Sequence, residues 1–290
     1  MSDFVILTDS SADLSAELAA QIGVQVLPLS FIMDDHTYYN YPDNREMDPH
    51  RFYERLRGGE LATTNAVNVA QYTEALEPLL QAGKDVLILS FSSGLSTTYN
   101  SSRLAVEELS ARYPDRKLYT VDTLCASLGQ GLLVWYAARE RDKGHSIEEV
   151  RDWIEERKLN LCHQFTVDDL HFLKRGGRIS AATAVVGSML QIKPVLHVDN
   201  EGHLINIGKV RGRHASLKAL VDRMEETAID SGSLTVFISH GDCLEDAETV
   251  AGMVKKRFGV QDIYINYVGP VIGAHSGPGT VALFYMGTER

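Results

Sequence analysis

Hydroxyl side chains gather at two points where an apolar run gives way to a polar loop. Residues 4–7 precede Thr8-Asp9-Ser10-Ser11, and residues 85–91 precede Ser92-Ser93-Gly94-Leu95-Ser96. A segment with helical periodicity follows each loop, so these hydroxyl groups stand where a strand meets a helix N-terminus. Side-chain and backbone donors at such a junction bind anions, and the same residues also serve as helix caps. The residues alone leave both interpretations open.

A third candidate lies near the end of the chain, where residues 269–279 are dense in glycine and proline around His275-Ser276. A backbone of this composition can approach a ligand closely, although a tight turn has the same composition. The segment therefore places one imidazole and one hydroxyl where ligand contact is expected.

Several kinds of chemistry are excluded by missing motifs. The sequence has no phosphate-binding loop of the Gly-x-x-x-x-Gly-Lys-Ser/Thr type and no Gly-x-Ser-x-Gly elbow around Ser93. Gly129-Gln130-Gly131 begins like a dinucleotide fingerprint, but it follows no strand, so we reject nicotinamide binding there. The histidines lack zinc spacing and the three cysteines are far apart, so we expect neither a metal nor a disulfide.

The elements that position these residues alternate between strands and helices in the first half of the chain. The strand at 85–91 and helix at 97–112 are followed by a strand at 117–121 that ends at Asp122. This rhythm predicts parallel βαβ units, whose ligand loops share the edge beyond the carboxyl ends of the strands. Residues 127–157 predict two helices broken near residues 143–145.

The pattern changes beyond residue 159. Residues 194–198 and 204–210 flank the polar turn Asp199-Asn200-Glu201-Gly202 and predict a hairpin. Helices at 214–229 and 244–258, a strand at 234–239 and terminal strands complete the segment. We therefore predict an α/β protein with two domains. Residues 1–158 form an N-terminal parallel-sheet domain, and residues 159–290 an α+β domain with a largely antiparallel sheet.

Composition and charge are those of an ordinary globular protein of 290 residues, with 44% hydrophobic residues and a formal net charge of −11. The negative charge argues against nucleic-acid binding. Residues 174–218 are an exception, because they hold eight basic and two acidic residues. Such a segment attracts an anionic ligand, a membrane headgroup or an acidic partner. Without a signal sequence or a long apolar run, we expect a cytoplasmic protein.

Four segments, in order along the chain, together resemble the DegV family. They are Thr8-Asp9-Ser10-Ser11-Ala12-Asp13-Leu14, Ser92-Ser93-Gly94-Leu95-Ser96-Thr97-Thr98-Tyr99, Leu173-Lys174-Arg175-Gly176-Gly177-Arg178-Ile179-Ser180, and residues 269–279. The third is the most specific. The resemblance implies a long-chain fatty acid in a tunnel between the two domains, with its carboxylate held by hydroxyl groups and a histidine.

The resemblance also implies roles for individual residues. Thr64, Ser92, Ser93, Arg175, His275 and Ser276 are expected to bind the ligand, and Arg178 and Arg211 to face a partner. In one branch of the family that partner is the ATP-binding subunit of a bacterial fatty acid kinase. The basic segment also makes transient contact with a membrane surface an expectation for this chain. The chain itself is then no enzyme, has no catalytic residue, and takes no cofactor beyond the bound fatty acid.

One motif departs from the family, which usually has Thr-Ser-x-Pro-Ser where this chain has Thr64-Asn65-Ala66-Val67-Asn68. Two alternatives therefore stay open. Ser93 and His275, with Asp9 or Asp122, are residue types that could form the triad of an acyl hydrolase. The basic segment could instead serve a regulatory interaction module whose pocket has lost its ligand.

Overall fold

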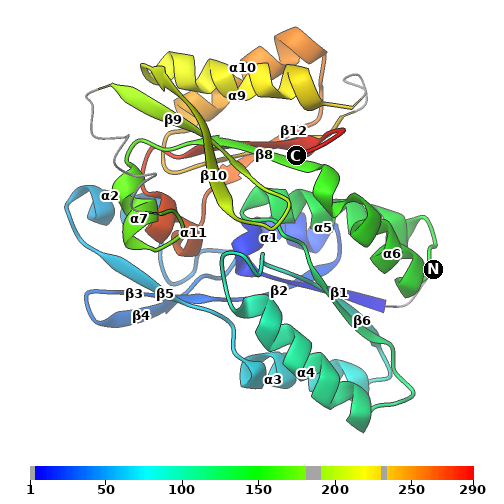
Figure 1. Cartoon of the computed structure of the whole chain (residues 1–290). Coiled ribbons are helices and arrows are strands. Elements are labelled where there is room, and N and C mark those ends of the chain that lie inside the picture. The colour runs from blue at the N-terminus through cyan, green and yellow to red at the C-terminus, as the bar shows by residue number, and fades with distance from the viewer. Residues whose placement is uncertain (1–3, 181–190, 230–233) are drawn as a thin grey trace.

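The structure is a computed structural model that describes residues 4–180, 191–229 and 234–290. Figure 1 shows two β-sheets stacked on either side of a helical layer, with a small third sheet beside the lower one. This mixed α/β architecture, with a parallel first sheet and a largely antiparallel second one, confirms the predicted fold class.

The first sheet is parallel and has the strand order β2-β1-β6-β7. Strand β6 is buried on both faces. Leu87 and Leu89 face the core between the sheets, and Val86 and Ile88 face the opposite side. Burial of both faces explains why this strand is a continuous apolar run in the sequence. The strands are Val24–Leu27 (β2), Phe4–Asp9 (β1), Asp85–Ser90 (β6) and Leu118–Asp122 (β7).

Helices cover both faces of this sheet. On the outer face lie α3 (Val69–Gln81) and α4 (Thr98–Arg112), and toward the second sheet lie α5 (Leu128–Asp142) and α6 (Ile147–Arg157). The short α1 (Ala16–Gln21) contacts β2. Because β1, β6 and β7 run parallel, the loops that follow them share one edge, as predicted.

The second sheet has six strands in the order β10-β9-β8-β13-β11-β12. Its pairs are antiparallel except for β11 and β12, which are parallel because a helix connects them. The strands are Leu161–Thr166 (β8), Ile192–Val198 (β9), Leu204–Arg211 (β10), Val236–His240 (β11), Ile263–Tyr267 (β12) and Val281–Met286 (β13). The helices α9 (Arg213–Thr227) and α10 (Leu244–Phe258) contact it.

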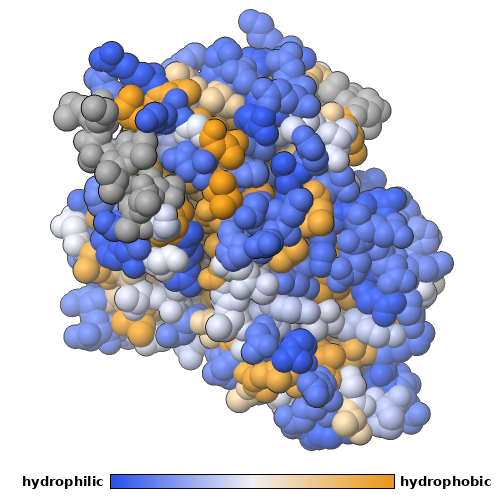
Figure 2. All heavy atoms as spheres, viewed as in Figure 1, coloured by the Kyte–Doolittle hydropathy of each residue, from blue (hydrophilic) through white to orange (hydrophobic). Residues whose placement is uncertain are grey.

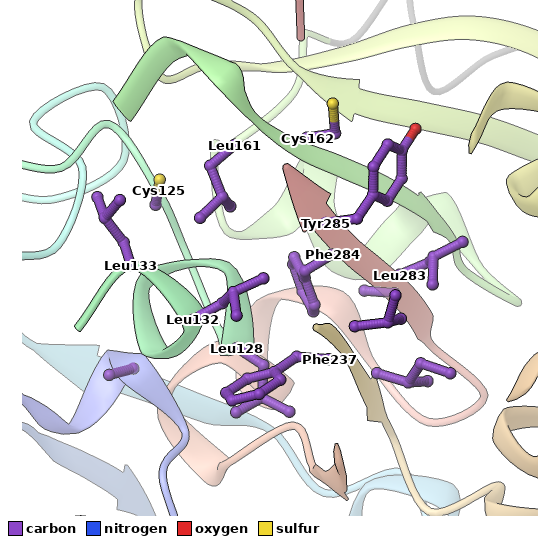
Figure 3. Close-up of a cluster of buried hydrophobic side chains, with 14 of the residues drawn as sticks. Cys125, Leu128, Leu132, Leu133, Leu161, Cys162, Phe237, Leu283, Phe284 and Tyr285 are labelled. Atoms are coloured by element: carbon purple, nitrogen blue, oxygen red, sulfur yellow. The ribbon is translucent and has the colours of Figure 1, made fainter. Parts of the chain in front are cut away.

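Helix α5 joins the two sheets into one core. Figure 3 shows Leu128, Leu132 and Leu133 beside side chains of β8, β11 and β13, such as Phe237 and Phe284. The same helix contacts β1 and β6 of the first sheet. Its apolar residues are therefore buried nearly all round, which is typical of a helix inside a core.

The two glycines at the start of α5 allow this close packing. A Cβ atom at Gly129 would overlap the His163 ring, and one at Gly131 would lie 2.6 Å from the carbonyl oxygen of Ala12. The Gly-x-Gly pattern therefore serves helix packing between the two sheets.

A third, antiparallel sheet has the order β4-β3-β5. It was not predicted from the sequence. Its strands, Ser30–Met33 (β3), His36–Tyr39 (β4) and Ala62–Asn65 (β5), have four residues each, too few for a clear alternation pattern. Beside it lie α2 (Pro49–Arg57) and α11 (Pro270–Ser276), and α11 packs on α7 (Leu170–Arg175). Single 3₁₀ turns occur at Ser10–Ala12 (η1) and Lys158–Asn160 (η2).

Candidate functional site

A cavity of about 590 Å³ lies between the first sheet, the second sheet and α11. Most of its wall is apolar, as a site for an apolar ligand requires. The apolar lining includes Leu29, Phe91, Leu95, Phe165, Leu173, Val268, Val271, Ile272, Ala282 and Phe284. The lining also includes four polar side chains that we call the cavity mouth: Thr64, Ser93, Arg178 and His275.

Thr64 and His275 form the central contact of the mouth. Thr64 Oγ1 lies 2.8 Å from His275 Nε2, and His275 Nδ1 is buried with no partner among the described residues. Burial, together with the positive charges of Arg178 and Arg175, lowers the pKa of His275 to about 4. The imidazole is therefore neutral at pH 7. If Nε2–H donates to Thr64, the threonine hydroxyl is left free to donate to a ligand.

The Gly-Gly-Arg segment after α7 shapes this contact. A Cβ atom at Gly176 would overlap His275 Nδ1, so the glycine makes room for the ring. Arg178 donates from Nε and Nη2 to the carbonyl oxygen of Leu95, at 3.2 and 3.0 Å, and from Nη1 to that of Gly176. These bonds hold a half-buried cation in the cavity wall.

Ser93 and Ser92 have different environments although they are neighbours. Ser93 is exposed and lines the cavity, and its backbone N–H donates to Asp122 Oδ1 at 3.1 Å. Ser92 is buried, and its hydroxyl donates to the carbonyl oxygen of Gly202 at 2.9 Å. Ser92 thus ties the loop after β6 to the β9–β10 turn.

The acidic residues near the mouth are committed to backbone donors. Asp9 accepts from the N–H of Phe91 at 2.8 Å, and Asp122 accepts from Ser93 and Leu124. Burial raises the pKa of Asp9 to about 6. Neither carboxylate contacts His275 in the described hydrogen bonds, so the described part of the chain shows no Ser-His-Asp relay.

The eight residues expected from the sequence thus divide into two groups. Thr64, Ser93, His275, Ser276 and Arg178 line the cavity. The other three lie outside its lining: Ser92 is buried behind it, Arg175 is exposed and stacks on Phe172, and Arg211 is exposed on the edge strand β10.

Sequence reasoning missed a second set of polar residues in the cavity wall. Ser127 and Ser239 line it, and Ser127 donates to Asp13 Oδ2 at 2.5 Å. Asp13 is 6% exposed, and burial raises its pKa to about 8. The signal that could have found Asp13 was its place in the Asp-Ser-Ser-Ala-Asp motif, but nothing in the sequence pairs it with Ser127 or Ser239.

The unusual motif at residues 64–68 retains two functions in the structure. Thr64, Asn65 and Ala66 line the cavity. Asn68 caps α3 by accepting from the N–H of Gln71, while the Gln71 side chain accepts from the Asn68 N–H. Asparagine and serine are equally good caps, so the last position of the motif keeps the chemistry of the family residue.

Neither a metal-binding cluster nor a membrane-spanning helix occurs in the part of the chain that the structure describes. Within residues 4–180, 191–229 and 234–290, His, Cys, Asp and Glu form no cluster of three that could hold a metal ion. The helices of the same ranges include none that is long and apolar enough to cross a bilayer.

Comparison with known proteins gives consistent results over the whole chain. Residues 3–288 match the DegV family. A DegV domain-containing protein of Clostridium perfringens is 47% identical over 290 residues, covering 100% of this chain and 99% of the relative.

Two solved structures are similar throughout. A DegV lipid-binding protein from Thermotoga maritima is 30% identical, with a TM-score of 0.87 and coverage of 99% of both chains. DegV of Bacillus subtilis, described as a fatty-acid-binding protein, is 28% identical, with a TM-score of 0.84 and coverage of 99% of this chain and 100% of its own.

Proposed function

The chain belongs to the DegV family, and we propose that it binds a long-chain fatty acid in the cavity with the carboxylate at the mouth. The contact between Thr64 and His275, in the wall of a largely apolar cavity of about 590 Å³, is the observation that carries the proposal. Similar structures described as lipid-binding or fatty-acid-binding support it.

The energetics of the two ligand ends match the two parts of the cavity. Each methylene removed from water contributes about 0.8 kcal/mol, so the acyl chain supplies most of the affinity. A carboxylate loses water on binding and needs hydrogen-bond donors in return. We assign this role to the hydroxyl groups of Thr64 and Ser93, with Arg178 as the nearby positive charge.

Titration of delipidated protein with stearate, followed by calorimetry, tests this proposal. We expect saturable binding of one ligand per chain, and much weaker binding of methyl stearate, which has the same chain but no charge. Failure of the free acid to bind would overturn the proposal. Equal affinity for acid and ester would overturn the assignment of the carboxylate to the mouth.

We further propose that the bound carboxylate is presented to an ATP-dependent kinase subunit. The cavity lining includes exposed polar residues, Ser93 of the mouth together with Asn65 and Asn100, so we expect one carboxylate oxygen to stay within reach of a partner. In the transfer, that oxygen attacks the γ-phosphorus of ATP, and ADP leaves. Arg211 on the edge strand β10 is exposed and basic, as an acidic partner surface requires.

The test combines the stearate-loaded protein, ATP and the ATP-binding kinase subunit of the same organism, and traps acyl phosphate with hydroxylamine as a hydroxamate. We expect hydroxamate only when all three are present, and a lower rate with Arg211→Glu at unchanged stearate affinity. Hydroxamate formation that does not need the chain would contradict presentation.

The hydrolase alternative is tested in the same preparation. Because Asp9 and Asp122 bond backbone N–H groups, we expect no turnover of a nitrophenyl acyl ester above background. Turnover that is lost in Ser93→Ala would revive that alternative.

A further inference from the structure

A second polar feature of the cavity is unused by the proposed function. Four hydroxyl side chains, which we call the hydroxyl wall, line the cavity: Ser127, Ser239, Ser276 and Thr280. All four are buried, with Ser239 at 0% exposure and Ser127 and Ser276 at 5%. An apolar acyl chain gives such groups no hydrogen-bond partner.

The hydroxyl wall consists of two hydrogen-bonded pairs. Ser127 Oγ and Ser239 Oγ are 2.9 Å apart, and Thr280 Oγ1 donates to the carbonyl oxygen of Ser276 at 3.1 Å. Ser239 is opposite Ala282 in the pairing of β11 with β13, and Thr280 precedes Ala282 by two residues. Side chains two residues apart along an extended chain face the same side, so Thr280 is a diagonal neighbour of Ser239.

The hydrogen-bonded chain that starts at Asp13 ends at Ser239, whose hydroxyl keeps unused hydrogen-bonding capacity on the cavity side. Asp13 Oδ2 bonds Ser127 Oγ, which bonds Ser239 Oγ, and no further partner of Ser239 Oγ occurs in the described hydrogen bonds. If Asp13 is ionised, both hydroxyl hydrogens point toward it, and Ser239 offers lone pairs to the cavity. If Asp13 is protonated, the direction can reverse, and Ser239 then offers a hydrogen.

A second hydroxyl of the wall supports the same conclusion independently. Ser276 Oγ is buried with no hydrogen-bond partner among the described residues. Ser276 follows His275 on α11, and consecutive helical residues point about 100° apart, so its hydroxyl has a direction of its own. His163, by contrast, also lines the cavity, but both of its ring nitrogens already have partners, Leu161 and Ala126.

A buried hydroxyl without a partner is destabilising, and a ligand that supplies the partner is favoured over one that does not. The complementary group must suit both directions of the Asp13 chain. A hydroxyl both donates and accepts, whereas a ketone or an ether only accepts. We propose that the hydroxyl wall recognises a hydroxyl group on the acyl chain, so that the ligand class includes hydroxylated long-chain fatty acids. This inference rests on the proposed function.

Calorimetric competition between stearate and a set of hydroxystearates, with the hydroxyl at different carbons, tests the inference on the delipidated full chain. We expect at least one positional isomer to bind about tenfold more tightly than stearate, as one added buried hydrogen bond allows. In Ser239→Ala the ratio of the two affinities should fall to about one. In Ser96→Ala the ratio should keep its wild-type value, because Ser96 also lines the cavity but is paired with Thr98.

The ratio of affinities separates this inference from the proposed function. If stearate binds and no hydroxystearate binds more tightly to the wild-type chain, the inference is overturned while fatty-acid binding stands. If neither ligand binds, the proposed function fails first. Because the wild-type comparison decides the question by itself, poor folding of Ser239→Ala does not leave it open.

Discussion

The mouth and the hydroxyl wall use the same side-chain chemistry in one cavity, but they differ in burial and in what their oxygen atoms are bonded to. Thr64 is half-buried and Ser93 is exposed, whereas Ser127 and Ser239 are buried and linked to a carboxyl group. Water can solvate a charged ligand group at the mouth until the hydroxyls replace it. The side chains of the hydroxyl wall, by contrast, are buried. Burial therefore decides whether a serine in this cavity suits a carboxylate or a neutral polar group.

The largest expected effect concerns the charged end of the ligand. Removing both hydroxyls in Thr64→Ala/Ser93→Ala should lower stearate affinity by about 100-fold or more, since hydrogen bonds to a charged group contribute roughly 1.5–3 kcal/mol each. Calorimetry measures the change. Thr63→Ala is the matched control, because Thr63 is next to Thr64 on β5 and lies outside the cavity lining. An unchanged affinity in the double variant would show that the mouth does not bind the carboxylate.

The second effect concerns the pH dependence of protein stability that arises from Asp13, the carboxyl group bonded to Ser127 of the hydroxyl wall. Folding raises the pKa of Asp13 to about 8, so the folded state holds this proton more tightly than the unfolded state does. The resulting contribution to the free energy of unfolding is fully present below about pH 4 and is lost as the pH rises toward 8. Asp13→Asn removes this titration. We expect the free energy of unfolding, from urea denaturation, to decline less between pH 5 and 8 in the variant, by a few kcal/mol.

The exposed Asp115→Asn is the control for this pH dependence, and it should decline as the wild type does. If Asp13→Asn and the wild type decline in parallel, Asp13 is not the titrating group, and the proton arrangement proposed for the Asp13 chain loses its support.

A smaller effect should follow from moving the His275 ring. A Cβ atom at Gly176 overlaps Nδ1 of that ring, so Gly176→Ala should weaken stearate binding by about tenfold, the result of losing roughly one hydrogen bond. In His275→Ala the ring is absent, and adding Gly176→Ala should then have little further effect. Additive effects in this double-mutant cycle would mean that Gly176 acts independently of His275.

The smallest effect separates helix capping from ligand binding. Asn68→Ala removes the cap of α3 and should lower the free energy of unfolding by about 1 kcal/mol. Stearate affinity should not change, and Asn68→Ser should restore stability. A loss of affinity without a loss of stability would show instead that the departure at residues 64–68 alters the mouth.

The sequence was sufficient for the fold class and for the elements with long, regular patterns. The apolar run at 85–91, the helical periodicity at 97–112 and the break near Gly144 correspond to β6, α4 and the boundary between α5 and α6. These features depend on local periodicity, which sequence reports directly. The four-residue strands of the third sheet lie below the length at which that signal is clear.

The candidate site likewise has a part that the sequence predicted and a part that it did not. Motif resemblance pointed to Thr64, Ser93 and His275, which line one cavity, but it could not distinguish Ser93 from Ser92 or place Arg178 and Arg175. The sequence by itself determined which hydroxyl, imidazole and guanidinium groups were available. Only the tertiary structure decided their burial and partners, because Asp13, Ser127 and Ser239 are more than 100 residues apart and meet only when α5 packs between two sheets.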